Sequence, residues 1–237
     1  MKAILLTCLV FCLTTTIVLA QDSNQNLNNK AWILPQAELG VGIQVVVPTG
    51  SFKENTQSIP GGLVGHYYHR IGSKFMLGGE ISAACISHNS YDIELPDGEM
   101  ATISEDENMW GLMLGGRFNF IGNAVMRSYS EVKVGTNSFY TSVSSCNEAL
   151  EDYNETQTHG TSFVSSFGMG LSIDPKGLFK KESGNTWIAF RGAYVVGTNV
   201  NYRSAPETMM RAPINQHVYN SSLGYFEIGV SASWQLH

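Results

Sequence analysis

The sequence is short of charge, because Asp, Glu, Lys and Arg make up only 14% of its 237 residues, against about 25% in a typical soluble protein. The net charge of −6 provides no basic stripe of the kind that nucleic-acid-binding proteins carry. Beyond the N-terminal segment, no apolar run reaches the about 20 residues that a transmembrane helix needs, and no long stretch has helical periodicity. These shortages exclude nucleic acid as a partner, argue against helical membrane spans, and leave too little charge for the surface of a soluble barrel.

The N-terminal segment has the composition of a cleaved signal peptide. Lys2 supplies the positive start, an uncharged apolar stretch runs to Leu19, and Val18-Leu19-Ala20 fits the cleavage positions. The stretch is short for a membrane anchor, and a polar Asn/Gln-rich run follows at once. We therefore expect export and cleavage after Ala20. The expected organisation is a signal peptide over residues 1–20, a flexible periplasmic leader over 21–35, and one domain over 36–237.

Cysteine is scarce, and only Cys85 and Cys146 of the four cysteines lie beyond the expected cleavage site. An oxidising compartment permits a disulfide between them. Their spacing does not decide whether they are bridged, because a disulfide depends on the distance between the two residues in space.

Eight segments alternate between apolar and small or polar residues, with the period of two that is typical of strands. The last is the clearest: Phe226, Ile228, Val230 and Trp234 lie on one face, and Glu227, Gly229 and Ser231 lie on the other. We predict strands over 36–47, 63–71, 74–87, 108–120, 127–140, 161–173, 186–202 and 225–236. The sequence does not decide which residues of the second segment share the apolar face. Short connections alternate with long ones, which are 48–62, 88–107, 141–160 and 203–217, although the basic connection 174–185 is long for a turn.

The opposite face of these strands decides between two barrels. A soluble lipocalin-like barrel places its apolar face inside, whereas a membrane barrel places it outside. Here the polar face is mostly Gly, Ser and Ala, which suits a narrow eight-stranded interior better than a water-facing surface. We therefore predict an all-β fold, an eight-stranded antiparallel up-and-down transmembrane β-barrel.

The few charges on that polar face predict a network inside the barrel, because charges in low dielectric must be paired. The alternative is that they are ordinary exposed charges. The predicted lumen set has four acids and four bases: Glu38, Arg70, Glu80, Arg117, Glu131, Lys133, Arg191 and Glu227.

Aromatic residues fall near the predicted strand ends, as in the interfacial girdles of membrane barrels. In a soluble barrel the same residues would be core. The predicted girdle residues are Phe75, Phe118, Phe120 and Trp234 at one end, and Trp110, Tyr140, Phe163 and Phe226 at the other.

With these strands in place, the chain from Gln36 to Leu236 resembles the small eight-stranded outer-membrane barrels, of the OmpX/OmpA type and the Bacteroidota outer-membrane β-barrel domain. Pro48-Thr49-Gly50-Ser51-Phe52 is similar to a Pro-x-Gly-x-Phe turn common in such proteins. The resemblance implies a Gram-negative outer membrane, contact with membrane lipid and lipopolysaccharide, insertion by the outer-membrane assembly machinery, and surface or envelope proteins as partners. One departure is that Gln235-Leu236-His237 follow Trp234, where many such barrels end in an aromatic residue.

No motif for catalysis, a cofactor or a metal is predicted. A lipid A deacylase would need a nucleophilic Ser beside an oriented His, and neither His159 with Ser162 nor His88 with Ser90 has a recognisable spacing. The acidic segment 88–107 lacks the ordered alternation of a Ca²⁺ loop, so we expect a solvated surface. The favoured function is a structural or surface-interaction role with a plugged lumen. The alternatives are a small-solute porin, a lipid A-modifying enzyme and a secreted soluble lipid-binding barrel.

Overall fold

The computed structural model describes residues 35–56, 59–94, 98, 100–122, 125–145, 155–180, 185–203 and 218–236. The chain divides into two compact units, Met1–Ile33 and Leu34–His237, and all described residues belong to the second. The predicted signal peptide and nearly all of the predicted leader lie outside the described residues. No helix within the described ranges is long and apolar enough to cross a membrane.

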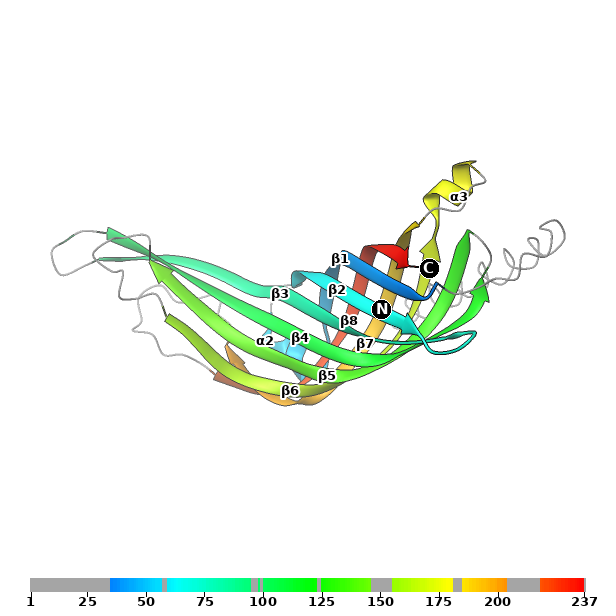
Figure 1. Ribbon diagram of the computed structural model, residues 1–237. Coiled ribbons are helices and arrows are strands. Elements are labelled where there is room, and N and C mark those ends of the chain that lie inside the picture. The colour runs from blue at the N-terminus through cyan, green and yellow to red at the C-terminus, as the bar shows by residue number, and fades with distance from the viewer. Residues whose placement is uncertain are drawn as a thin grey trace. The chain divides into compact units, whose positions relative to one another are not determined.

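The second unit is a closed barrel in which each strand pairs with its sequence neighbours (Figure 1). The barrel closes by antiparallel pairing of the first strand with the last, from Ala37 opposite Leu236 to Pro48 opposite Tyr225. This confirms the predicted all-β, eight-stranded up-and-down barrel. The strands are β1 (Ala37–Pro48), β2 (Gly61–Arg70), β3 (Phe75–Glu94), β4 (Met100–Gly122), β5 (Met126–Ser145), β6 (Glu155–Ile173), β7 (Thr186–Arg203) and β8 (Val218–Leu236).

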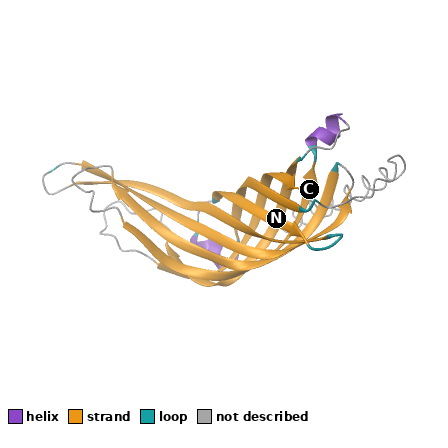
Figure 2. Cartoon of the chain, viewed as in Figure 1, coloured by secondary structure: helices purple, strands orange, loops and turns teal. Residues whose placement is uncertain are grey.

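The two ends of the barrel differ. One end, here called the short-turn end, holds the β2–β3, β4–β5 and β6–β7 connections, the start of β1 and the end of β8. The other, the long-loop end, holds the four remaining connections. Two short helices, α2 (Gly50–Asn55) and α3 (Pro175–Lys180), lie in the β1–β2 and β6–β7 connections (Figure 2). Neither helix was predicted, since one turn and a half of helix has too few residues to show a 3.6-residue period.

Several strands extend further toward the long-loop end than predicted. The expected loop 88–107 is largely a hairpin, in which β3 pairs with β4 from Ser87 opposite Glu107 to Glu94 opposite Met100. In the same way, β5 continues to Ser145, β6 begins at Glu155 and β8 begins at Val218. The prediction was wrong here because strand pairing uses the backbone and needs no apolar face. The apolar alternation marks only the part of each strand that lies in the apolar belt.

Burial along the strands is inside-out for a water-soluble protein. Large apolar side chains point outward and are exposed, with Ile43 at 65%, Leu114 at 65% and Phe163 at 70%. The residues between them point inward and are buried. The second strand, whose inward face the sequence left undecided, follows the same rule. Val64, His66 and Tyr68 are buried, while Leu63 and Tyr67 are exposed. The outward apolar residues of all the strands form a continuous band, called here the apolar belt.

Candidate functional site

Charged side chains fill the barrel interior next to the short-turn end. Each of them is at most 9% exposed, and they come from six strands, with β5 supplying three. The set consists of Glu38, Glu80, Arg117, Arg127, Glu131, Lys133, Arg191 and Glu227, and we call it the lumen network.

The part of the lumen network nearest the short-turn end is built around Glu38. One carboxylate oxygen of Glu38 accepts a hydrogen bond from Arg117 Nη1 at 2.7 Å, and the other accepts from Arg127 Nη2 at 3.3 Å. The Arg117 guanidinium lies between the rings of Tyr68 and Tyr129, 4.0 Å from each centroid. Aromatic faces attract a cation electrostatically, so this arginine is held by ions along its edge and by rings on its two faces.

Deeper in the barrel, Glu131 joins the two halves of the network. It accepts from Arg117 Nη2 at 3.3 Å and contacts Lys133 Nζ at 3.0 Å. Lys133 also donates to Glu80 at 2.9 Å. Arg191 pairs with Glu227 on the neighbouring strand β8 and reaches across the lumen to Glu80 and Glu131. No member of this group can be removed without changing the partners of at least one other.

The lumen network is electrically balanced, since four carboxylates face four cations among the described residues. Taking one charge out of water costs several kcal/mol, and this cost is offset only where partners and hydrogen bonds are in place. A balanced and interlinked set meets that condition. An unbalanced set would leave one buried charge without compensation.

The sequence prediction included Arg70 and omitted Arg127. Arg70 lies half-buried at the short-turn mouth, on the inward-facing side of β2. Arg127 pairs with Glu38, and its guanidinium stacks 4.1 Å from the Trp187 ring centroid. The signal was available, because Arg127 lies four residues before Glu131 and so shares its face of the strand.

Sequence reasoning also missed the neutral side chains that complete the network. His66 is buried, with Nε2 3.5 Å from a Glu38 oxygen. The Tyr68 hydroxyl donates to Glu131 at 3.4 Å. The first contact joins the neighbouring strands β1 and β2, and the second crosses the lumen from β2 to β5. Both depend on how the strands pair and close, so no local pattern in the sequence marks them.

Toward the long-loop end the interior holds a cluster of apolar side chains, to which α2 contributes one. Phe52 is 0% exposed and packs edge-on against Phe139, with ring centroids 6.2 Å apart, and against Tyr225 at 6.4 Å. The helix is held to β8 by the Thr49 N–H, which donates to the Gly224 carbonyl at 2.8 Å. The segment Pro48–Phe52 therefore ends β1 and turns its phenylalanine into the barrel. We call Phe52 and the buried apolar residues around it the apolar plug; they include Val46, Ile86, Met109, Met113, Phe139, Val195, Leu223 and Tyr225.

The predicted girdle aromatics lie on the outer wall, but only one group is near the strand ends. Near the short-turn end, Phe75 contacts Phe118 with centroids 4.8 Å apart, and Phe120 and Trp234 are exposed or half-buried. The other group lies within strands that continue further toward the long-loop end. There Trp110 donates its ring N–H to the Tyr140 hydroxyl at 2.7 Å, and Phe163 and Phe226 are exposed or half-buried.

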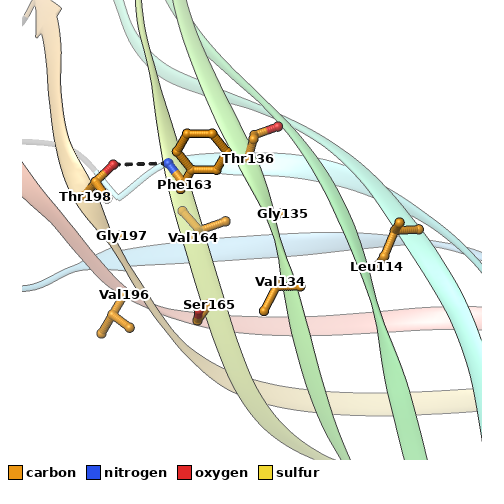
Figure 3. Close-up of a pocket in the computed structure, with 10 residues that line it drawn as sticks. All are labelled: Leu114, Val134, Gly135, Thr136, Phe163, Val164, Ser165, Val196, Gly197 and Thr198. Carbon is orange, nitrogen blue, oxygen red and sulfur yellow. Dashed lines mark hydrogen bonds between the residues drawn. The ribbon is translucent and has the colours of Figure 1, made fainter.

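A shallow cavity of about 580 Å³ opens on the outer wall between β4 and β7. Figure 3 shows that Leu114, Val134, Phe163 and Val196 surround it, and the Phe163 N–H donates to Thr198 Oγ1 at 3.1 Å. Most of its lining side chains point outward, so the cavity is a shallow depression in the surface of the apolar belt. Its apolar lining suits hydrocarbon rather than a polar substrate.

The residues weighed for catalysis do not come together among the described residues. The Ser162 hydroxyl is buried and donates to the Thr198 carbonyl at 2.8 Å, while the His159 side chain lies outside the described residues. His88 is exposed and pairs with Asp106 at 2.6 Å across the β3–β4 hairpin. Within the described ranges no group of His, Cys, Asp and Glu side chains could hold a metal ion.

The predicted loop cysteine, Cys146, lies outside the described residues, and Cys85 is a free thiol exposed on β3. The Cys85 sulfur lies 3.7 Å from the Ser87 carbonyl oxygen. The pairing of β3 with β4 shifts register between these two residues, so Cys85 lies where the barrel wall passes into the extended hairpin.

No protein-family model matches the chain, and no curated protein matches it. Among solved structures, Neisserial surface protein A (NspA) is similar with a TM-score of 0.52 at 10% identity, and the match covers 85% of this chain and 97% of that one. Ail, the attachment invasion locus protein of Yersinia pestis, was solved in complex with the heparin analogue sucrose octasulfate; it gives a TM-score of 0.45 at 12% identity, over 85% of this chain and 100% of Ail. The N-terminal β-barrel domain of Pseudomonas aeruginosa OprF gives a TM-score of 0.37 at 11% identity, and the match covers 84% of this chain and 99% of that one. The match to Neisserial surface protein A shows that the two chains share the barrel fold.

Proposed function

We propose that this protein is an integral outer-membrane barrel of a Gram-negative bacterium, with a closed interior and an interaction surface at its long-loop end. The observation that carries the proposal is the inside-out burial of the barrel. Leu114 and Ile43 are each 65% exposed on the outer wall, while Arg117 and Glu131 are at most 2% exposed inside. In water this arrangement would expose a large apolar surface. In a bilayer the same surface contacts hydrocarbon.

The interior supports a structural role rather than transport. The lumen network crosses the barrel near one end, and the apolar plug fills it toward the other. An eight-stranded barrel is just wide enough for its side chains to fill. We therefore favour a rigid, non-conducting scaffold over the small-solute porin.

The long-loop end supports a role in surface interaction. There β3 and β4 extend as a paired hairpin beyond the end of β2, and the hairpin is acidic, with Asp92, Glu94, Glu105 and Asp106 and no Lys or Arg between His88 and Glu107. A negative surface attracts positively charged partners and repels polyanions. The proposed partners are membrane lipid and lipopolysaccharide at the belt, the assembly machinery during insertion, and a surface or envelope protein at the hairpin. The Pro48–Phe52 segment is similar to a turn common in small outer-membrane barrels of both the OmpX/OmpA type and the Bacteroidota domain.

The test is fractionation followed by gel migration. The mature protein should need detergent for extraction from the membrane. Its gel band should migrate differently before and after heating, because the folded barrel resists unfolding by the detergent in the gel until it is heated. In planar bilayers the purified protein should show no steady conductance. Recovery in the soluble fraction without detergent would overturn the membrane proposal. Steady conductance would overturn the closed interior and favour the porin.

A further inference from the structure

The β6–β7 connection, which is too long for a plain turn, is organised around α3. The Asp174 N–H donates to the Val125 carbonyl at 2.7 Å, and this contact holds the connection against the β4–β5 connection. The Asp174 carboxylate then accepts from the Lys176 N–H at 2.9 Å, and the Asp174 carbonyl accepts from the Leu178 N–H at 3.1 Å. Asp174 thus starts the helix and fixes it to the rim of the barrel.

This short helix exposes its two largest apolar side chains. Leu178 is 56% exposed and Phe179 is 83% exposed. The other described helix, α2, has the same length, and its Phe52 is fully buried inside the barrel. The chain can therefore bury a helical phenylalanine in a connection, but it leaves this one uncovered.

The exposed pair on α3 continues the apolar belt. On the outer wall, Phe190 is opposite Leu171 and Ile188 is opposite Ile173, and only Asp174 separates Ile173 from the helix. Figure 1 shows α3 just beyond the ends of β6 and β7. The apolar surface that faces the bilayer therefore leads to the helix at the short-turn end.

Lysines flank the apolar pair in sequence. Lys176 is exposed in the first turn, and Lys180 is the last residue of α3. Apolar side chains beside lysines are the composition of segments that lie in the membrane interface, where the apolar groups enter the acyl boundary and the cations approach lipid phosphates. The acid nearest to Lys176 in sequence, Asp174, is buried and bonded to the backbone of the helix.

We propose that α3 is an interfacial anchor, in which Leu178 and Phe179 enter the phospholipid leaflet at the short-turn end and Lys176 contacts its anionic headgroups. This inference rests on the proposed membrane location. Bound in this way, α3 sets the depth and tilt of the barrel on the β6–β7 side. The same chemistry could serve an acidic protein of the periplasm, but continuity with the belt favours lipid.

The experiment places a nitroxide spin label at Phe179→Cys in a Cys85→Ser, Cys146→Ser background of the mature chain. The protein is refolded into vesicles of phosphatidylethanolamine and phosphatidylglycerol, and the heat-dependent gel shift verifies the barrel. Collision of the label with oxygen, which concentrates in hydrocarbon, is compared with collision with a water-soluble nickel chelate. Two matched positions calibrate the ratio: Phe190→Cys in the belt and Ser73→Cys in the exposed β2–β3 turn.

The expected oxygen-to-nickel ratio at position 179 is severalfold above that at Ser73→Cys and close to that at Phe190→Cys. Adding Lys176→Glu should lower the ratio in vesicles that contain phosphatidylglycerol, and lower it less in phosphatidylcholine alone. A ratio equal to that of Ser73→Cys in a heat-modifiable barrel overturns the anchor, leaves the membrane barrel standing and favours a protein partner. Loss of the gel shift in the unsubstituted chain as well overturns the proposed function itself. If only Phe179→Cys fails to fold, Leu178→Cys gives the same readout.

Discussion

Replacing Arg191 with methionine should destabilise the barrel more than any exposed substitution. Arg191 contacts Glu80, Glu131 and Glu227, which come from three other strands and are each at most 3% exposed. Methionine keeps much of the side-chain volume but removes the charge. The lumen network of the Arg191→Met variant would then hold four carboxylates and three cations.

The magnitude follows from that imbalance. Removing one partner of a buried ion pair costs about 3–5 kcal/mol, because the other charge stays buried without compensation. With a urea dependence of about 2 kcal/mol per M, a loss of about 4 kcal/mol lowers the unfolding midpoint by about 2 M. The measurement is urea unfolding of the refolded protein in lipid vesicles, followed by the fraction of heat-modifiable band.

Three further variants test the reason for the loss. The double variant Arg191→Met with Glu227→Gln restores a balance of three acids and three bases, and should recover a large part of the stability. Arg191→Lys keeps the charge but loses the planar fork of donors, so its midpoint should lie between those of the wild type and Arg191→Met. Lys74→Met removes an exposed cation and should stay within about 0.5 kcal/mol of the wild type. The charge-balance argument is refuted if Arg191→Met matches Lys74→Met, or if the double variant is no more stable than Arg191→Met.

The other predictions concern the plug, the packing of the interior and the outer wall. Phe52→Ala should cost about 3–5 kcal/mol of unfolding free energy by the same urea assay, and an unchanged midpoint would show that the plug is not packed. Gly170→Val should block refolding, because its Cβ would lie 2.2 Å from Tyr129 Cζ. The control is Gly61→Ala, because a Cβ at position 61 would meet open space. Equal yields of heat-modifiable band from the two variants would contradict the packing. Leu114→Arg should cost about 2–4 kcal/mol if this wall faces the middle of a bilayer. A water-facing wall would accept this arginine with no loss, so an unchanged midpoint would argue against a lipid-facing belt.

The fold was readable from the sequence because strand alternation is a local signal. The closing strand, from Tyr225 to Leu236, has one fully apolar face, and side chains one residue apart must point to opposite faces. A contrast of Leu and Ile against Gly and Ser then shows which face is outside, since only small residues fit a narrow lumen. Glu131 and Lys133 could be assigned to the interior for the same reason.

What lies beyond the apolar belt could not be read in this way. The paired stretch from Ser87 to Glu107 is rich in polar and acidic residues. Ala101 and Ile103 are buried on one face, but so short an apolar pattern does not separate the stretch from a loop. The helices α2 and α3 are shorter than the window that a helical period needs. Phe52 in α2 and Phe179 in α3 look alike in sequence, yet one is buried in the barrel and the other is exposed.

The sequence by itself determined the number of strands, the face that each turns inward and the scarcity of charge inside. These features depend on neighbours one or two residues apart. Only the tertiary structure decided that Arg127 pairs with Glu38, that Arg191 joins acids from three other strands, and that a connection supplies the plug. Those choices depend on the register and closure of the barrel, which bring together side chains far apart in sequence, such as Arg191 and Glu80, 111 residues apart.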